Sequence, residues 1–199
     1  MLERARALGF TGVLIGNLGH LPLVRGLNFH LYGDYGLNVF NSRSLAYLKD
    51  KELESACVSF ELRFAQIRDL KKVLRAEAIV YGRLPLMITE NCLVQNETGC
   101  RLDRQGPCVP EDGPCRCGQP NVLVDRTGAA FPLLPAYGHR TEIQNSKPLY
   151  LADRPEHRRL GLAYARLRFT TETAEECVSV VQNYLDAAPA AGDFTRGLY

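Results

Sequence analysis

The sequence predicts an α/β fold. In the first ninety residues, short apolar segments flanked by glycine alternate with amphipathic helical segments. Strands buried on both faces and joined by helices are typical of a parallel sheet. The 199 residues supply only about four such units, whereas a closed eight-stranded barrel takes about 250 residues. We therefore expect a half or incomplete TIM-like (β/α) barrel, with a small, complete doubly wound domain as the alternative.

The expected elements follow one another in order. The first ninety residues predict helices over 2–8, 42–48 and 64–74, and strands over 12–16, 29–33, 56–62 and 77–81. Glycine, proline and cysteine then replace any apolar period over 91–121, which predicts a long loop of the kind that is functional or held by metal. Residues 122–152 predict a β-hairpin region, because Asp125-Arg-Thr-Gly128 separates two apolar arms. Together these segments form a single domain over 1–199.

The last part of the chain predicts a strand over 163–169 and a helix over 172–186. Thr171 is the candidate N-cap of that helix, and acidic residues follow in its first turn. The apolar face of the helix consists of Ala174, Cys177, Val180, Val181 and Tyr184. We expect Cys177 on that face, and Cys57 in the third strand, to pack in the core.

Composition excludes several classes of protein. Apolar residues make up 46% of the chain and charged residues 23%, which excludes a disordered chain. No apolar run approaches the roughly 18–20 residues that span a bilayer. The first eight residues carry charges and no apolar export signal, so the expected location is cytoplasmic and no membrane partner is expected. A net charge of +2 neither requires nor excludes nucleic acid.

Cysteine is the unusual residue of this chain. Five of the seven cysteines lie in the predicted loop, with the spacing Cys92-x7-Cys100-x7-Cys108-x6-Cys115-x-Cys117. In a reducing compartment clustered thiols more often bind metal than form disulfides. Thiolates suit zinc or an iron–sulfur cluster, although the paired Cys-x-x-Cys of a zinc ribbon is absent. Unligated cysteines in a surface loop are the alternative.

Several segments resemble the peptidase U32 (collagenase-like) family. They are EAIVYGRLPLMITENC (77–92), LVDRTGAAFP (123–132), IQNS (143–146) and FTRGLY (194–199). The chain is most similar to the second-half barrel segment of the long bacterial members. The resemblance implies a barrel with an inserted cysteine cluster that binds a 4Fe-4S type cluster. It also implies oxygen-independent hydroxylation of RNA bases or of the ubiquinone ring, despite the name peptidase.

The family pattern also implies a ligand set. Cys92, Cys100 and either Cys115 or Cys117 match its first three cysteines, and the fourth falls at His139. Either His139 replaces that ligand or the extra loop cysteines supply it. We expect Cys92, Cys100, Cys115 and Cys117 to share the centre, with His139 as the substitute for any one of them. Cys108 lies in an apparent insertion and is left out of the set.

No residue pattern identifies the catalytic groups. His-Glu-x-x-His and Gly-x-Ser-x-Gly are absent, and His20, His30 and His157 have no partner spacing. Glu61, Glu77 and Arg83 lie at or near predicted strand ends, where barrel enzymes place their active sites. They are equally consistent with structural salt bridges.

Two groups of basic residues are candidates for RNA binding. One lies over 63–75 and the other over 154–168; they consist of Arg63, Arg68, Lys71, Lys72 and Arg75, and of Arg154, Arg158, Arg159, Arg166 and Arg168. Such stripes follow RNA phosphates or form ordinary solvated faces. The leading hypothesis is iron–sulfur-dependent modification of RNA or a related substrate, as part of a larger enzyme. A collagenase-like peptidase and a zinc-stabilised interaction module are the alternatives. The expected protein partner is a second copy or the missing half-barrel.

Overall fold

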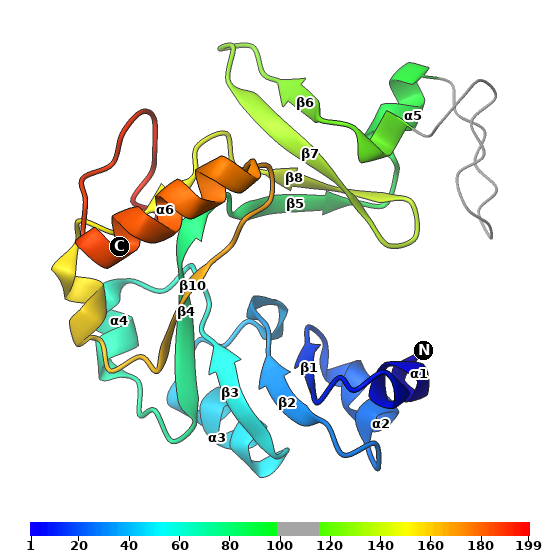
Figure 1. Cartoon of the computed structure of the whole chain (residues 1–199), viewed down its shortest axis with the longest axis vertical. Coiled ribbons are helices and arrows are strands. Elements are labelled where there is room, and N and C mark those ends of the chain that lie inside the picture. Colours follow the sequence, from blue (N-terminus) through cyan, green and yellow to red (C-terminus); the bar gives the residue numbers. More distant parts are fainter. Residues whose placement is uncertain (99–115) are drawn as a thin grey trace.

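The computed structural model describes residues 1–98 and 116–199, which form two β-sheets (Figure 1). The larger sheet contains five parallel strands in the order β1-β2-β3-β4-β10. They are β1 (Gly12–Ile15), β2 (His30–Gly33), β3 (Leu53–Cys57), β4 (Arg75–Gly82) and β10 (Tyr164–Leu167). The short β9 (Leu149–Tyr150) pairs antiparallel with the end of β4. The α/β class is confirmed, but β1 and β10 do not meet in the described part of the chain, so there is no closed barrel there.

Helices cover one face of this sheet. The chain adds α1 (Leu2–Ala7), η1 (Leu18–His20), α2 (Leu21–Val24), η2 (Tyr35–Leu37), α3 (Ser42–Asp50), α4 (Phe64–Asp69) and η4 (Pro155–Arg159). Asn41 begins α3, because its side chain accepts a hydrogen bond from Ser44 N. Leu45 and Leu48 of α3 and Ile67 of α4 are buried against the sheet and form the main core.

Two predicted elements end earlier than expected. The helix over 64–74 ends at Asp69, because Leu70 is extended and Lys72 Nζ donates to the carbonyl of Ile67 at 2.6 Å. The third strand is displaced: β3 covers Leu53–Cys57 instead of 56–62, and a turn follows in which Leu62 N donates to Ser59 O at 3.2 Å.

The predicted hairpin is confirmed within a second, antiparallel sheet. Its strands, in the order β5-β8-β7-β6, are β5 (Pro85–Thr89), β8 (Arg140–Gln144), β7 (Ala130–Ala136) and β6 (Asn121–Val124). Asp125 stabilises the β6–β7 turn by accepting hydrogen bonds from Thr127 N and Ala129 N. The short helices α5 (Leu93–Thr98) and η3 (Arg116–Gly118) lie at one end of this sheet.

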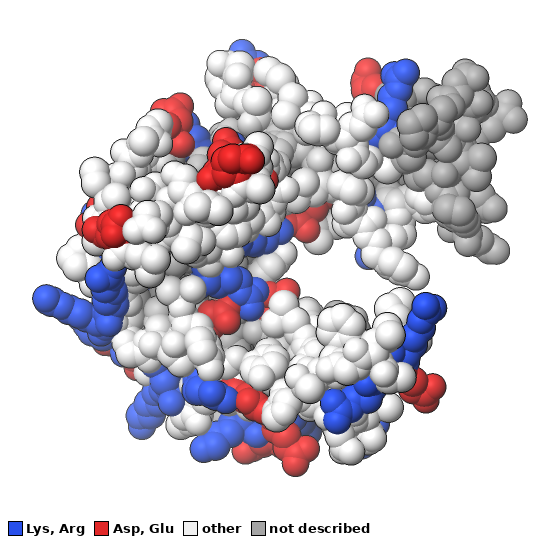
Figure 2. Space-filling model, viewed as in Figure 1, with Lys and Arg blue, Asp and Glu red and all other residues white. Residues whose placement is uncertain are grey.

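The parallel sheet is not buried on both faces. Leu14 on β1 is 49% exposed and Tyr164 on β10 is 42% exposed. Figure 1 shows α3 on one side of the sheet, and Figure 2 shows a hollow between this sheet and the antiparallel sheet. The expectation of fully buried strands is wrong for these edge strands, because no helix of the described chain covers their second face.

The C-terminal part packs against the end of β4. The helix α6 (Ala174–Asp186) is capped by Thr173, not Thr171: Thr173 Oγ1 accepts from Glu176 N while Glu176 accepts from Thr173 N. No residue of α6 is buried, so Cys177 is only partly covered rather than a core residue. After α6 the chain returns, and Tyr199 stacks on Phe64 with ring centroids 4.8 Å apart.

Gly82 brings the two sheets together. It has φ +116°, which favours glycine, and a Cβ there would lie 2.0 Å from the carbonyl oxygen of Arg168. The end of β4 therefore touches the end of β10, directly before β5 leaves for the second sheet. Within the described residues, no helix is long and apolar enough to cross a membrane.

Candidate functional site

Charged side chains gather where β2 and β3 end, beside β4 and β10. Arg166 on β10 forms ion pairs with Asp34, which follows β2, and with Glu77 on β4. These three side chains are only 15–22% exposed. Beneath them, Cys57 on β3 is fully buried, and burial raises the pKa of its thiol to about 12. Cys57 is thus a protonated core thiol at neutral pH, as the sequence analysis expected, and not a nucleophile.

Arg168 joins this cluster to the antiparallel sheet. Its guanidinium donates to Glu142 Oε1 at 2.8 Å and to Gln144 Oε1 at 2.7 Å, both on β8. It also donates to the carbonyl of Arg83 at 2.7 Å. The Arg168 guanidinium lies 5.5 Å from the ring centroid of Tyr35, and burial raises the pKa of the Tyr35 phenol, which therefore keeps its proton. We call Asp34, Glu77, Glu142, Arg166 and Arg168 the polar cluster.

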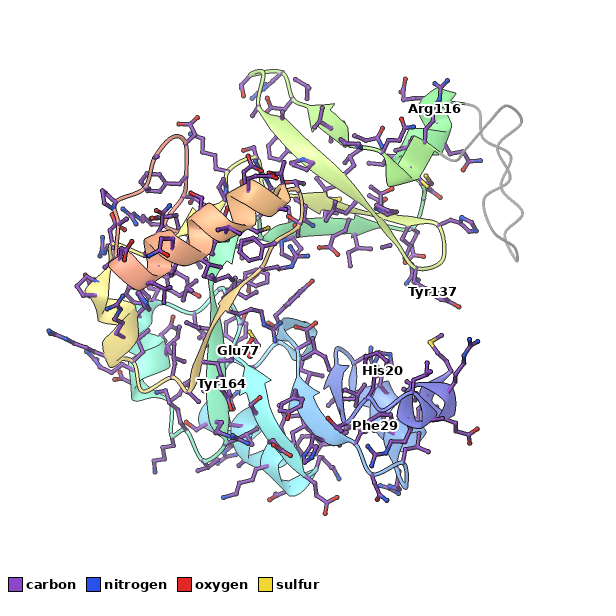
Figure 3. All side chains as sticks on the ribbon, in the orientation of Figure 1. His20, Phe29, Glu77, Arg116, Tyr137 and Tyr164 are labelled. Carbon is purple, nitrogen blue, oxygen red and sulfur yellow. The ribbon has the colours of Figure 1, made fainter. Side chains whose placement is uncertain are left out.

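The polar cluster combines three carboxylates with two guanidinium groups, all of them largely shielded from solvent. Figure 2 shows basic and acidic side chains side by side in the hollow between the two halves of the molecule. Figure 3 shows Glu77 on the side of the parallel sheet that faces this hollow, with Tyr137 at the tip of the β7–β8 hairpin on the opposite side. The arrangement suits a polar substrate that approaches the strand ends, which is where α/β proteins bind their ligands.

Of the three predicted catalytic candidates, the structure places only Glu77 in this cluster. Arg83 has a structural role, because its guanidinium donates to the carbonyls of Asn145 and Ser146 and so holds the segment after β8. Glu61 is exposed, and its carboxylate has no ion pair with any described residue. Sequence reasoning missed Asp34 and Glu142. It grouped Arg166 and Arg168 with the basic stripe, although charges at alternate positions of an apolar strand signal one shared polar face.

Two of the predicted metal ligands lie on one small apolar cluster. Cys92, between β5 and α5, is 6% exposed and packs with Val94 and Leu133, and Cys117 in η3 packs against the same group. The turn that carries Cys92 is fixed to β8, since Leu93 N donates to Thr141 Oγ1 at 3.0 Å. Figure 3 shows the adjacent Arg116 beside α5. Both ends of the cysteine-rich segment therefore lie against the same apolar cluster.

Of the other predicted metal ligands, the structure describes only His139. Cys100 and Cys115, and the excluded Cys108, lie outside the described residues. His139 stands in the β7–β8 turn with φ +60° and is half-buried. Among the residues that the structure describes, no three His, Cys, Asp or Glu side chains form a metal site. Cys92 and Cys117 are the two predicted ligands that the structure brings to one apolar cluster.

Many basic residues of the two predicted stripes are bound by the protein itself. Arg75 pairs with Glu54 at 2.9 Å, and Arg158 donates to the carbonyl of Tyr184 at 3.2 Å. Arg166 and Arg168 belong to the polar cluster. RNA binding by these stripes stays a prediction. A separate pocket of about 650 Å³ beside α3, lined by Leu18, Leu37 and Tyr47 among others, shares no residue with the polar cluster.

Fold and site together define an α/β protein with an ion-paired polar cluster at its strand ends and a thiol-bearing segment on an adjoining sheet. The sequence profile of peptidase family U32 matches residues 1–123, and the chain belongs to this family. The matched region includes β1–β4, Asp34, Glu77 and the whole cysteine-rich segment, whereas Glu142, Arg166 and Arg168 lie beyond it. No curated protein and no solved structure matches the chain.

Proposed function

We propose that this chain binds an iron–sulfur cluster and belongs to a larger enzyme that modifies RNA, or a related substrate, by oxygen-independent hydroxylation. The observation that supports the proposal most is that Cys92 and Cys117 pack in the same apolar cluster. Cys100 and Cys115 of the enclosed segment complete a four-thiolate set, with His139 as the substitute ligand. An iron–sulfur cluster, when bound, supplies one-electron chemistry.

The polar cluster is the substrate side of this proposal. Its members are partly exposed, so a substrate can exchange hydrogen bonds with Arg166 and Arg168 without unfolding the sheet. The Tyr35 phenol keeps its proton and serves as a donor or acceptor beside Arg168. Arg168 holds β8, and with it the sheet that carries the thiols, against the ends of the parallel strands.

We also infer that the five parallel strands are part of a (β/α) barrel. Their neighbours in the sheet follow the order of the chain, as barrel strands do, with the antiparallel sheet inserted between β4 and β10. The polar cluster then lies at the end of the barrel where such enzymes place their active sites.

Anaerobic purification tests the proposed function and separates it from its two alternatives. The proposal expects iron, acid-labile sulfide and a visible charge-transfer absorbance, all lost in Cys92→Ser and retained in Cys177→Ser. Stoichiometric zinc without iron would instead support the interaction module. Chelator-sensitive cleavage of gelatin by clean, iron-free protein would instead support the peptidase.

A further inference from the structure

β10 is an open edge of the parallel sheet. It pairs with β4 on one side, where Ala163 N donates to Ala76 O and Arg168 N donates to Tyr81 O. No strand in the described ranges pairs with its other side. Peptide groups on the open side of a strand are a template for another strand.

The helix α6 next to β10 carries a second apolar face. Val180 and Tyr184 pack against the chain's own buried residues. Ala174, Val178, Val181 and Leu185 follow at spacings of four, three and four residues, which places them on one face of the helix. Val178 is 70% exposed, Val181 42% and Leu185 72%, so no described part of the chain covers this face.

A groove connects the helix to the strand edge. Its volume is about 380 Å³, and its lining includes Leu162, Tyr164, Leu167, Val181 and Leu185. Arg158 also lines it, but its guanidinium donates to the carbonyl of Tyr184 at the end of α6. The open strand, the groove and the apolar face of α6 form one continuous surface, which we call the β10–α6 edge.

The opposite end of the sheet has matching properties. β1 pairs only with β2 among the described strands. Leu8 is 69% exposed, Phe10 61% and Leu14 49%, and α1 buries none of its residues. We call this surface the β1–α1 edge.

The helices of the two edges carry opposite net charge. The helix α1 has Arg4 and Arg6 against a single acid, Glu3. The helix α6 has Glu175, Glu176 and Asp186 and no basic residue. Figure 2 shows the acidic side chains over the position of α6 and basic side chains around the N-terminus. Contact between unlike edges is therefore attractive, whereas contact between two α6 helices places like charges together.

We propose that the β10–α6 edge docks on the β1–α1 edge of a second copy of this chain, with β10 beside the second copy's first strand in parallel. A twofold axis along the strands repeats the contact, so that both open edges of each copy are paired at once. The exposed apolar residues of both edges are then covered, and the hollow in front of the polar cluster is enclosed by two copies. This inference does not depend on the proposed function.

Sedimentation velocity of the full chain over a range of micromolar concentrations tests the proposal. The expected result is a species of twice the mass of one chain. Val178→Lys should weaken the association at least tenfold, because it places a charge on the docked face of α6. Val73→Lys is the matched control, since Val73 is 45% exposed and lies outside both edges; it should have no effect.

Charge reversal distinguishes unlike edges from like ones. One variant carries Glu175→Lys and Asp186→Lys on α6, and the other carries Arg4→Glu and Arg6→Glu on α1. Each alone should associate at least tenfold more weakly than the unchanged chain, and an equimolar mixture should recover the association. Circular dichroism checks that each variant is folded. A monomer at every concentration, no effect of Val178→Lys, or unchanged association of the charge-reversed chains would each overturn the proposal.

Discussion

Arg168→Met tests whether one guanidinium holds the two sheets together. The substitution keeps an unbranched side chain but removes the partner of Glu142 and the donor to Gln144 Oε1. The Glu142 and Arg168 side chains are each 16% exposed, and Gln144 is fully buried. Without Arg168 the Glu142 carboxylate keeps the hydrogen bond from Gln144 Nε2 at 2.6 Å but has no opposite charge, and the buried Gln144 Oε1 loses its donor.

The structure gives the expected size of this effect. Losing one partner of a buried ion pair costs about 3–5 kcal/mol. Partial exposure lowers this cost, so we expect a loss of about 3 kcal/mol in the free energy of unfolding. Adding Glu142→Gln to the variant removes the unpaired charge and should restore about 1–2 kcal/mol, which a double-mutant cycle measures as coupling.

Urea unfolding followed by circular dichroism measures both values. Arg140→Met is the control, because the Arg140–Glu90 pair has a similar separation of 3.0 Å but side chains that are 45% and 79% exposed. An exposed pair contributes at most about 1 kcal/mol. If Arg168→Met costs no more than this control, Arg168 does not hold the sheets together and the account of the polar cluster fails.

Three further substitutions test other parts of the fold. Gly82→Ala should destabilise by roughly 3–5 kcal/mol or prevent folding, because the new Cβ would meet the Arg168 carbonyl at a positive φ; a stable variant by thermal melting refutes this close approach. Burial lowers the pKa of His157, so the folded state binds fewer protons and stability falls as pH drops below about 6.5. His157→Gln should reduce this loss between pH 7 and 5 in urea titrations, and an unchanged slope would contradict the burial argument. A hydrogen bond from Arg196 lowers the pKa of Asp153, so its contribution is present above about pH 4 and is lost as pH falls through the lower folded value. Asp153→Asn should be less stable than the unchanged chain at pH 7 and should lose less on acidification to pH 3, which parallel urea titrations check.

Local pattern predicted the elements better than their assembly. The alternation of apolar and polar residues located β1, β2, β4 and the β6–β7 hairpin, because strand periodicity and turn chemistry are local properties. The sequence does not predict the pairing of β5 with β8, because the cysteine-rich segment separates these strands and they pair only through tertiary contact. The cap of α6 was placed two residues early, since Thr171 and Thr173 both precede acidic residues and only Thr173 forms the capping box.

Local sequence patterns also predict only part of the candidate site. Glu77 was a candidate because it lies on a predicted strand, but Asp34, Arg166 and Glu142 come from three distant segments that only the sheet order brings together. Composition alone predicts the cysteine-rich segment, because its five cysteines lie in a glycine- and proline-rich stretch without the apolar periodicity of core residues. Only the structure shows that Cys92 and Cys117 pack in the same apolar cluster.

Iron and sulfide analysis of anaerobically purified protein shows whether the cysteine-rich segment holds an iron–sulfur cluster. We expect iron and acid-labile sulfide in equal amounts, about four of each per chain for a 4Fe-4S cluster. We also expect their loss in Cys92→Ser, together with reduced stability because metal binding and local folding are linked. Full metal content in Cys177→Ser is the control. Protein that contains neither iron nor sulfide when purified without oxygen, or Cys92→Ser protein that retains both, would contradict the account.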